Sequence, residues 1–525
     1  MAKELYLTPG DPSGAEMRAK KAYGWESAET IVPKAPTGKG LMSMYCKSLQ
    51  ARSEQSEIEN TPVKQKRRSA EVESRGDDSR QLYEQKEEQQ VELIEWILQD
   101  SNIDEAIRTV KRNKGAAGVD GMTVEELDAY YAVHREEIKS QIREGRYKPS
   151  PVRRVYIPKA NGKKRPLGIP TVTDRVVQQM TAQILSLGYD KYFSDNSYGF
   201  RPNRDCHGAI EKALEYLNEG YEWVIDLDIE KYFDTVNHDK LISILRERIN
   251  DAKTLRLIRQ FLRAGVMEDG LVSPSEEGVP QGGPLSPILS NVYLDKLDKE
   301  LESRGLHFVR YADDCNIFVK SEMAADRVMK SVTSWLERKL RLKVSATKTK
   351  VVRPNKSNFL GFTFWNSKDG WKCRPADDRK KKLYDKTREL LCRKKATARS
   401  MKKTFTELNW LIRGWVNYYR IGSMKDFINK YGQWLRHKVR VVILKQWKRP
   451  RTICRNLMKL NRIVGNEGNE FEEKRLVAVA NARQGWYRMA TIREINFLLN
   501  PTILSMKTKD RPGLVDPLAY YLSNA

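Results

Sequence analysis

The stretch that decides the fold is FVRYADDCNIFVK at residues 308–320. Its flanks, FVRY and CNIFV, have the aromatic and β-branched composition of strands, and Ala-Asp-Asp between them suits a turn. We therefore predict a β-hairpin with Asp313 and Asp314 at its tip. Adjacent carboxylates repel each other, so a shared divalent cation would stabilise the pair. A solvated surface turn is the alternative interpretation of this stretch taken alone.

A second source of acids lies upstream, in EWVIDLDIEKYFDTV at residues 222–236. Residues 223–227 have the pattern of a buried strand, which would direct Asp226 and Asp228 to the same face. We predict that Asp228, Asp313 and Asp314 bind two Mg²⁺ ions roughly 3.5–4 Å apart, the arrangement that activates a 3′ hydroxyl and stabilises leaving pyrophosphate in nucleotidyl transfer.

Further blocks follow one another in a specific order around these acids. Together they resemble the reverse transcriptases encoded by bacterial group II introns, over roughly residues 90–525. The blocks are RRVYIPKANGKKRPLGIPTVTDRVVQQ (153–179), YGFRPNRDCHGAI (198–210), the Asp228 strand, VPQGGPLSPILSNVYLDKLDKEL (279–301), YADD and FLGF (359–362). The tail resembles most the class C proteins, which lack an endonuclease domain.

The resemblance implies an α+β fold of the right-hand polymerase type, with an antiparallel palm sheet and a helical thumb. The expected parts are an N-terminal extension that is disordered (1–88), extension helices and fingers (89–222), the palm (223–374), a thumb or maturase domain (375–449) and a small DNA-binding domain (450–525).

Several substrate contacts are implied by position. In the basic hairpin that begins at residue 153, Lys163 and Arg165 would face the nucleotide phosphates, and an exposed basic hairpin is the alternative. Phe233 would act as a steric gate against a 2′ hydroxyl, unless it packs in the core. Gln281 would contact the sugar, and Ile229 would join the metal and substrate site.

A lysine is also expected near the leaving group. Lys348 matches the position of a residue that can protonate pyrophosphate, with Lys350 as a rival. Ser345 and Thr347 stand where Asn and an acidic residue are expected, so this local match is looser.

The net charge of +26 indicates a polyanionic partner. Residues 372–460 hold 27 Lys and Arg against 6 Asp and Glu, a difference of +21. We expect helices with basic faces that grip a duplex, although a bundle core would explain most aromatics such as Trp410. The predicted nucleic-acid contacts are Arg201, Arg204, Arg436, Lys438, Arg440, Lys448 and Arg449.

Composition excludes other classes. The six cysteines form no CxxC pair, which argues against zinc and against a disulfide framework. No run of 18 apolar residues occurs, so we expect no membrane span and a cytoplasmic, nucleoid-associated protein.

The predicted function is RNA-directed DNA synthesis with Mg²⁺, or Mn²⁺ as a substitute, combined with binding of intron RNA to assist splicing and retromobility. The expected partners are group II intron RNA, an RNA template with a DNA primer, target DNA and deoxynucleoside triphosphates. Two alternatives stay open at this point: a free-standing reverse transcriptase in repair or phage defence, and an RNA-binding maturase whose polymerase is unused.

Overall fold

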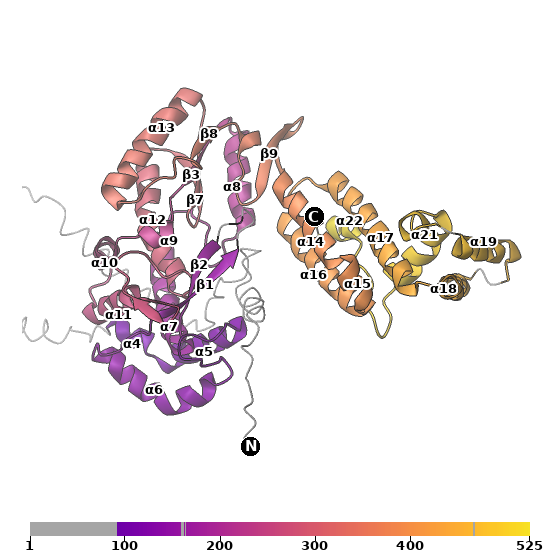
Figure 1. Ribbon diagram of the computed structural model, residues 1–525. Helices are drawn as coiled ribbons and strands as arrows, with labels where there is room; N and C mark the ends of the chain where they lie inside the picture. The colour runs from indigo at the N-terminus through magenta and orange to yellow at the C-terminus, as the bar shows by residue number, and fades with distance from the viewer. Residues whose placement is uncertain (1–91, 159–161, 163, 466–467, 483, 525) are drawn as a thin grey trace, which may run out of the picture. The chain divides into compact units, whose positions relative to one another are not determined.

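The computed structural model describes residues 92–158, 162, 164–465, 468–482 and 484–524. The predictions for residues 1–88 and for Lys163 lie outside this part of the chain. The described residues divide into two compact units (Figure 1). The first ends at Tyr216 and resumes over Tyr221–Val351, and the second comprises Leu217–Gly220 and the chain from Val352 onward. Within the described ranges, none of the helices has both the length and the apolar character needed to cross a membrane.

The centre of the first unit is a sheet of four strands in the order β6-β7-β3-β8. The predicted hairpin at residues 308–320 is confirmed, because β6 and β7 pair antiparallel across the Ala-Asp-Asp turn. The predicted strand before Asp228 is also confirmed, as β3, and it pairs antiparallel with β7. The bounds are β3 (Trp223–Asp228), β6 (His307–Tyr311), β7 (Asp314–Val319) and β8 (Lys350–Val352).

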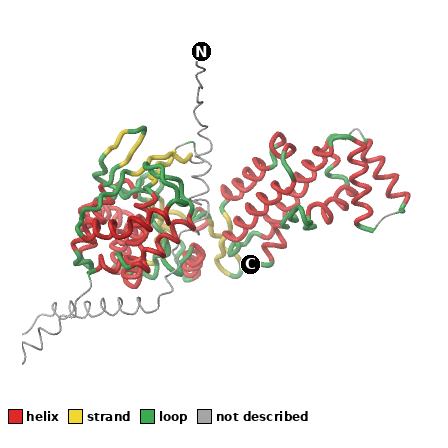
Figure 2. Tube along the Cα trace, turned by 90° about the horizontal axis from the view of Figure 1, so that it is seen from below, coloured by secondary structure: helices red, strands yellow, loops and turns green. Residues whose placement is uncertain are grey.

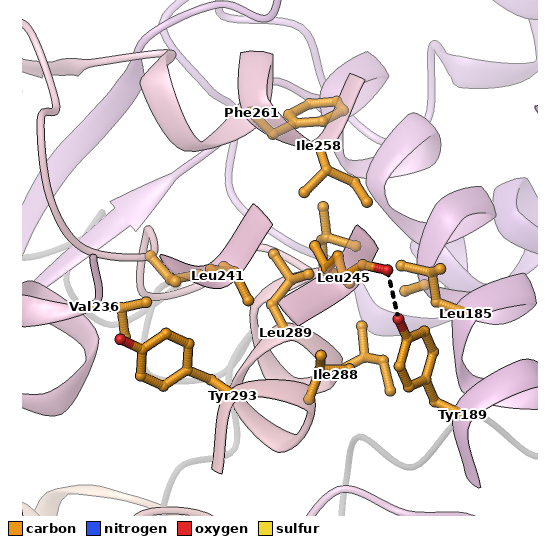
Figure 3. Packing of buried hydrophobic residues seen from close by; sticks show 14 of the residues in the cluster. Leu185, Tyr189, Val236, Leu241, Leu245, Ile258, Phe261, Ile288, Leu289 and Tyr293 are labelled. Atoms are coloured by element: carbon orange, nitrogen blue, oxygen red, sulfur yellow. Dashed lines mark hydrogen bonds between the residues drawn. The ribbon is translucent and has the colours of Figure 1, made fainter. Parts of the chain in front are cut away.

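Helices form a continuous apolar core with this sheet. Figure 3 shows part of it, where side chains from α7, α10, α11 and α12 meet and the Tyr189 hydroxyl donates to the Leu245 carbonyl at 3.4 Å. These helices span Val172–Tyr189 (α7), His238–Arg246 (α10), Ala252–Arg263 (α11) and Ser286–Ser303 (α12). The others in this unit are α4 (Leu93–Ile97), α5 (Asp100–Asn113), α6 (Leu127–Arg143), η1 (Asp190–Tyr192), α8 (Cys206–Asn218), α9 (Tyr232–Thr235), α13 (Glu322–Trp335) and η2 (Leu336–Leu340).

Helix α7 is buried on almost every side. Val176, Val177 and Met180 are buried, and so are the polar side chains of Gln178 and Gln179. The reason is that α4, α5 and α12 all pack on α7, so the helix lies inside the unit and has almost no solvent-facing side.

A second sheet, in the order β2-β1-β4-β5, carries the predicted basic hairpin. Strands β1 (Val152–Pro158) and β2 (Lys164–Ile169) pair antiparallel, and β4 (Val266–Glu268) and β5 (Leu271–Ser273) extend the sheet on the β1 side. The hairpin therefore brings Arg165 into a fixed strand.

The second unit begins with a hairpin and is otherwise mostly helical (Figure 2). Strands β9 (Phe362–Ser367) and β10 (Gly370–Pro375) pair only with each other in the sheets of the described chain. The Phe362 ring lies 4.9 Å from that of Tyr419, so the hairpin packs on the helices. The two compact units divide at 351/352, so this hairpin belongs to the second unit. The division at 374/375 between palm and thumb stays a prediction.

Residues 376–449 form helices as expected, and α14 and α15 are separated by a short break near Cys392. The segments are α14 (Asp377–Leu390), α15 (Arg393–Ala398), α16 (Met401–Tyr419) and α17 (Lys425–Trp447). Trp415 and Tyr419 pack among other aromatic rings, whereas the expectation of a core role fails for Trp410, which is 67% exposed. The remaining elements are η3 (Pro354–Lys356), α18 (Pro450–Ile463), α19 (Glu470–Asn481), α20 (Trp486–Met489), α21 (Arg493–Leu499), η4 (Asn500–Leu504) and α22 (Pro517–Leu522).

Candidate active site

The register of β3 against β7 brings the predicted acids together. Asp228, the last residue of β3, lies directly opposite Asp314, the first residue of β7. Directly opposed side chains of an antiparallel pair project to the same face, with Cβ atoms about 4.5–5.5 Å apart. Asp226 projects to this face too, because it stands two residues before Asp228.

Asp313 reaches this face from the turn between β6 and β7. The preceding Ala312 has a φ of 56°, in the left-handed region, which is uncommon for a residue with a side chain. Burial raises the pKa of Asp313, and the charge of Asp228 raises it further. The crowding of protein atoms around Asp314, whose side chain still reaches solvent, together with the charges of Asp313 and Asp228, raises the pKa of Asp314 to about 7.

Two lysines neutralise part of this negative charge. Lys348 Nζ lies 2.9 Å from each carboxylate oxygen of Asp228, and Lys350 Nζ lies 3.5 Å from Asp226. The two lysines that the sequence left as rivals therefore pair with different acids, and Lys348 is the one on the predicted metal ligand.

The site has a shortage of positive charge that a divalent ion would relieve. The charge of Asp228 disfavours the ionised forms of Asp313 and Asp314, which is the behaviour expected of carboxylates that would share a cation. In the described chain, no three His, Cys, Asp or Glu side chains are grouped closely enough to form a ready-made metal cage. The side chain of Ile229 is buried, so only its main chain could contribute.

One pocket of the first unit is lined by both predicted sugar contacts, Phe233 and Gln281. Phe233 is half-buried and packs against the Tyr232 ring at 5.2 Å, so it has one face in the core and one on the pocket. The other walls include Phe200 and the glycine-proline segment 282–284.

Gln281 connects the pocket to the basic hairpin. Arg165 Nε donates to Gln281 Oε1 at 3.1 Å, and Gln281 Nε2 donates to Asp234 Oδ1 at 3.4 Å. At Gly282, which has a φ of +116°, an added Cβ would lie 2.5 Å from the Gly168 carbonyl oxygen. Only glycine permits this approach of the two segments. Arg165, Gln281 and Asp313 therefore border one site, as the effect of the Arg165 charge on Asp313 also shows.

Two of the predicted nucleic-acid contacts are corrected by the structure. Arg201 is 4% exposed and donates to Asp190, Ser194 and Ser197. Arg440 is 6% exposed and donates to the Ala490 carbonyl and to Asn500. Both guanidinium groups hold the protein together, because they donate to acceptors inside the protein and are buried.

The other predicted nucleic-acid contacts differ in solvent exposure and in their partners. Arg204 and Arg436 are partly exposed and form ion pairs with Asp195 and Asp516, each at 2.6 Å. Lys438 lies over the Tyr487 ring at 5.3 Å. Lys448 and Arg449 are exposed directly after α17, so they are the members of the set best placed to meet a phosphate.

Sequence reasoning missed a buried group beneath the acidic turn. Arg310, two residues before Ala312, forms a fully buried ion pair with Asp298 of α12. The available signal was a charged residue inside an otherwise apolar strand, because such a residue must find a partner when the strand is buried.

Comparison with known proteins agrees with this site. Residues 157–364 match the family described as reverse transcriptase (RNA-dependent DNA polymerase), and residues 380–460 match the group II intron maturase-specific domain. Protein YkfC of Escherichia coli is 34% identical over 361 residues, covering 61% of this chain and 92% of that protein.

Two intron proteins are also similar. The group II intron-encoded protein LtrA of Lactococcus lactis is 38% identical over 219 residues, which is 42% of this chain and 36% of LtrA. A putative COX1/OXI3 intron 2 protein of Saccharomyces cerevisiae is 34% identical over 251 residues, which is 47% of this chain and 28% of that protein. The matches to these two thus span about a third of their length. The chain therefore belongs to the family of group II intron-encoded reverse transcriptases and maturases, RNA-directed DNA polymerases that also assist splicing.

Proposed function

We propose that this protein copies RNA into DNA by metal-assisted nucleotidyl transfer at Asp228 and Asp313, and that it binds the RNA of its own group II intron to assist splicing and retromobility. The observation that carries the proposal is the register of β3 and β7, which places Asp228 opposite Asp314 and beside the turn that holds Asp313. Acids from separate strands on one face are what two-metal transfer requires.

The ions we infer are two Mg²⁺, with Mn²⁺ as a substitute. Asp228, Asp313, Asp314 and the main chain of Ile229 would hold them. When bound, the metal pair supplies activation of the primer 3′ hydroxyl and neutralisation of the leaving pyrophosphate. Lys348 is tethered to Asp228 in this structure. In the reaction, its ammonium would give a proton to the leaving group.

The pocket lined by Phe233 and Gln281 would receive the incoming deoxynucleoside triphosphate. Phe233 would pack against its sugar and exclude a 2′ hydroxyl, while Gln281 would contact the sugar edge. Arg165, held by Gln281 at 3.1 Å, would pair with the phosphates, since a guanidinium binds phosphate oxygens in a bidentate manner.

Intron RNA is the second substrate that we infer. The support is the maturase-specific match at residues 380–460, which overlaps the basic segment 372–460. Positive charge of this density favours a nucleic-acid backbone. The template-primer duplex and target DNA would meet the same helical unit.

The test is primer extension by the full-length protein on an RNA template with an annealed DNA primer, combined with splicing of the intron transcript at low Mg²⁺. We expect metal-dependent cDNA and faster splicing. Asp313→Asn should lower extension by about a thousandfold or more while leaving RNA binding and splicing intact, because it removes a metal ligand only.

The matched control is Asp326→Asn on the exposed face of α13, which should extend primers at the wild-type rate. Extension by Asp313→Asn at the wild-type rate would refute the metal assignment. Splicing without any effect of the wild-type protein would refute the intron RNA assignment.

A further inference from the structure

The catalytic turn rests on a guanidinium that has no access to solvent. Arg310 is 0% exposed, and each of its five N–H groups has an acceptor. Nε and Nη2 donate to the two Asp298 oxygens at 2.7 and 2.6 Å, Nη2 also donates to Ser197 Oγ at 2.8 Å, and Nη1 donates to Asn291 Oδ1 at 3.2 Å and to the Ala312 carbonyl at 2.9 Å. The arginine is therefore held rigidly on all sides.

The bond to Ala312 matters most, because that carbonyl belongs to the peptide unit whose N–H is the amide of Asp313. A peptide unit is planar, so an acceptor held at one end fixes the direction of the donor at the other. The amide nitrogen of this unit is bonded to the Cα atom of Asp313, so the orientation of the peptide sets the direction in which the Asp313 side chain leaves the turn. We propose that Arg310 is a positioning residue for the reaction, which sets the carboxylate of Asp313 through the Ala312–Asp313 peptide.

The surroundings of Arg310 support a positioning role. Asp298 and Asn291 lie on α12, and Asn291 Nδ2 also donates to the Gly199 carbonyl at 2.8 Å. An added Cβ at Gly199 would lie 2.3 Å from the Ala312 amide nitrogen, so the loop that contains Gly199 packs directly against the turn. Helix, loop and turn are thus joined at a single guanidinium.

A purely stabilising role explains the contacts less well. Burying an ion pair costs desolvation energy that its attraction barely returns, and an apolar pair of similar size is often as stable. The ion pair with Asp298 also does not require the bond to Ala312. That bond supports a left-handed backbone conformation, φ 56°, at the residue before a metal ligand.

The decisive variant replaces the pair with apolar residues, Arg310→Met together with Asp298→Leu, because no unpaired buried charge remains and the fold is expected to survive. The inference rests on the proposed function, so primer extension by the wild type is measured first. We expect the midpoint of the Mg²⁺ dependence to rise by about tenfold or more, as is typical when the support of a metal ligand is removed. The KM for deoxynucleotide and the affinity for RNA should stay at wild-type values.

A second readout does not depend on turnover. Electron paramagnetic resonance measures the binding of Mn²⁺ to the protein in complex with template-primer. In the Met-Leu double variant, the Mn²⁺ affinity should fall by the same factor, about tenfold or more. Ser197→Ala keeps every charge and leaves one N–H of Arg310 without an acceptor, so it should shift both midpoints by about two- to tenfold and lower the melting temperature by a few degrees.

A third variant, Arg310→Lys, keeps the charge of the side chain, and Arg399→Lys is its matched control. Arg399 lies in the helical unit and donates to the same kinds of acceptor: the Glu407 carboxylate at 2.6 Å, the Thr404 hydroxyl at 3.0 Å and the Leu390 carbonyl at 2.8 Å. Lysine cannot reproduce the planar fork of arginine at either site. Both variants should therefore lower the melting temperature, but only Arg310→Lys should weaken Mn²⁺ binding.

The outcomes distinguish the proposed function from the positioning role of Arg310. An inactive wild type would count against the proposed function and not against the positioning of Asp313, which the Mn²⁺ measurement still tests. If the folded Met-Leu double variant has the wild-type midpoints for Mg²⁺ dependence and for Mn²⁺ binding, the positioning role is overturned. If that variant does not fold, Ser197→Ala decides, and a wild-type Mn²⁺ midpoint there would overturn it.

Discussion

Lys348 Nζ lies 2.9 Å from both carboxylate oxygens of Asp228, although 120 residues separate the two in the chain. The Asp228 carboxylate is the ligand that the proposed mechanism needs for a metal ion. A cation of the protein therefore contacts both oxygens of this carboxylate, and in the proposed mechanism it would have to share them with the metal.

This pairing gives a prediction for Lys348. Lys348→Met should lower turnover by about a hundredfold, because the protein then has no proton donor to pyrophosphate at this position. It should also lower the Mg²⁺ concentration needed for half-maximal rate, since Asp228 no longer has a competing partner. Single-turnover extension across a Mg²⁺ series measures both effects. Lys350→Met is the control, as Lys350 pairs with Asp226, and a larger loss there would identify Lys350 as the proton donor.

The position of Phe233 predicts selection against ribonucleotides. Phe233→Val should raise the use of ribonucleotides relative to deoxynucleotides by about 10- to 100-fold, because a smaller side chain leaves room for the 2′ hydroxyl. Competitive incorporation of the two nucleotide types gives the ratio. Phe200→Val, a second aromatic of the same pocket, serves as the control. A wild-type ratio in a folded Phe233→Val protein would leave Phe233 with core packing alone.

The exposure of Lys448 and Arg449 predicts a role in RNA affinity. Replacing both with Ala should weaken binding and flatten the plot of log affinity against log salt by about 0.7 to 0.9 for each phosphate that the protein no longer neutralises. Binding titrations between low and moderate salt measure the slope, and cDNA length should fall with it. The exposed pair Arg327 and Lys330 on α13 provides a matched double variant. Equal slopes for the two double variants would show that residues 448 and 449 face only solvent.

The same structure predicts that Arg440→Ala acts differently. Its guanidinium is buried and donates to Ala490 and Asn500, so the change should lower the melting temperature and leave unpaired acceptors behind. The salt slope should stay at the wild-type value, because Arg440 contacts no phosphate. A flattened slope in a variant with unchanged melting temperature would contradict the assignment of Arg440 to the protein interior.

Asp295 on α12 predicts a dependence of stability on pH. Burial and then the charge of Asp298 raise its pKa to about 6, and its Oδ1 atom is buried without a hydrogen-bond partner among the described residues. Between about pH 4 and 6 the folded state holds this proton and the unfolded state releases it, so stability falls as pH rises and the loss is complete above about pH 6.

Asp295→Asn removes this penalty. The variant should unfold at a higher temperature than the wild type above about pH 6, with a gain on the order of 2 to 3 kcal/mol, and the difference should vanish near about pH 4. Melting curves of both proteins across this range measure it. The exposed Asp369→Asn should show no such divergence. A gain of equal size at every pH would rule out the titration of Asp295 as the cause.

Much of the site was visible in the sequence because its signals are local. The composition of FVRY and CNIFV predicts two strands, and the two-residue spacing of Asp226 and Asp228 predicts a shared face. The glycines and proline of residues 282–284 disfavour regular structure, and the helix that follows them begins at Ser286. Each of these patterns depends on neighbours along the chain, which the sequence displays directly.

Tertiary structure decided the rest. The register that sets Asp228 against Asp314, and the meeting of Arg165 with Gln281, join segments that are 86 and 116 residues apart. Arginines that look alike in the sequence differ in burial: Arg201 and Arg440 are buried, whereas Arg449 is exposed. The sequence by itself determined which strands carry the candidate acids. Only the fold decided which charged side chains reach the surface and which, like that of Arg310, are buried, because burial depends on contacts between residues far apart in the chain.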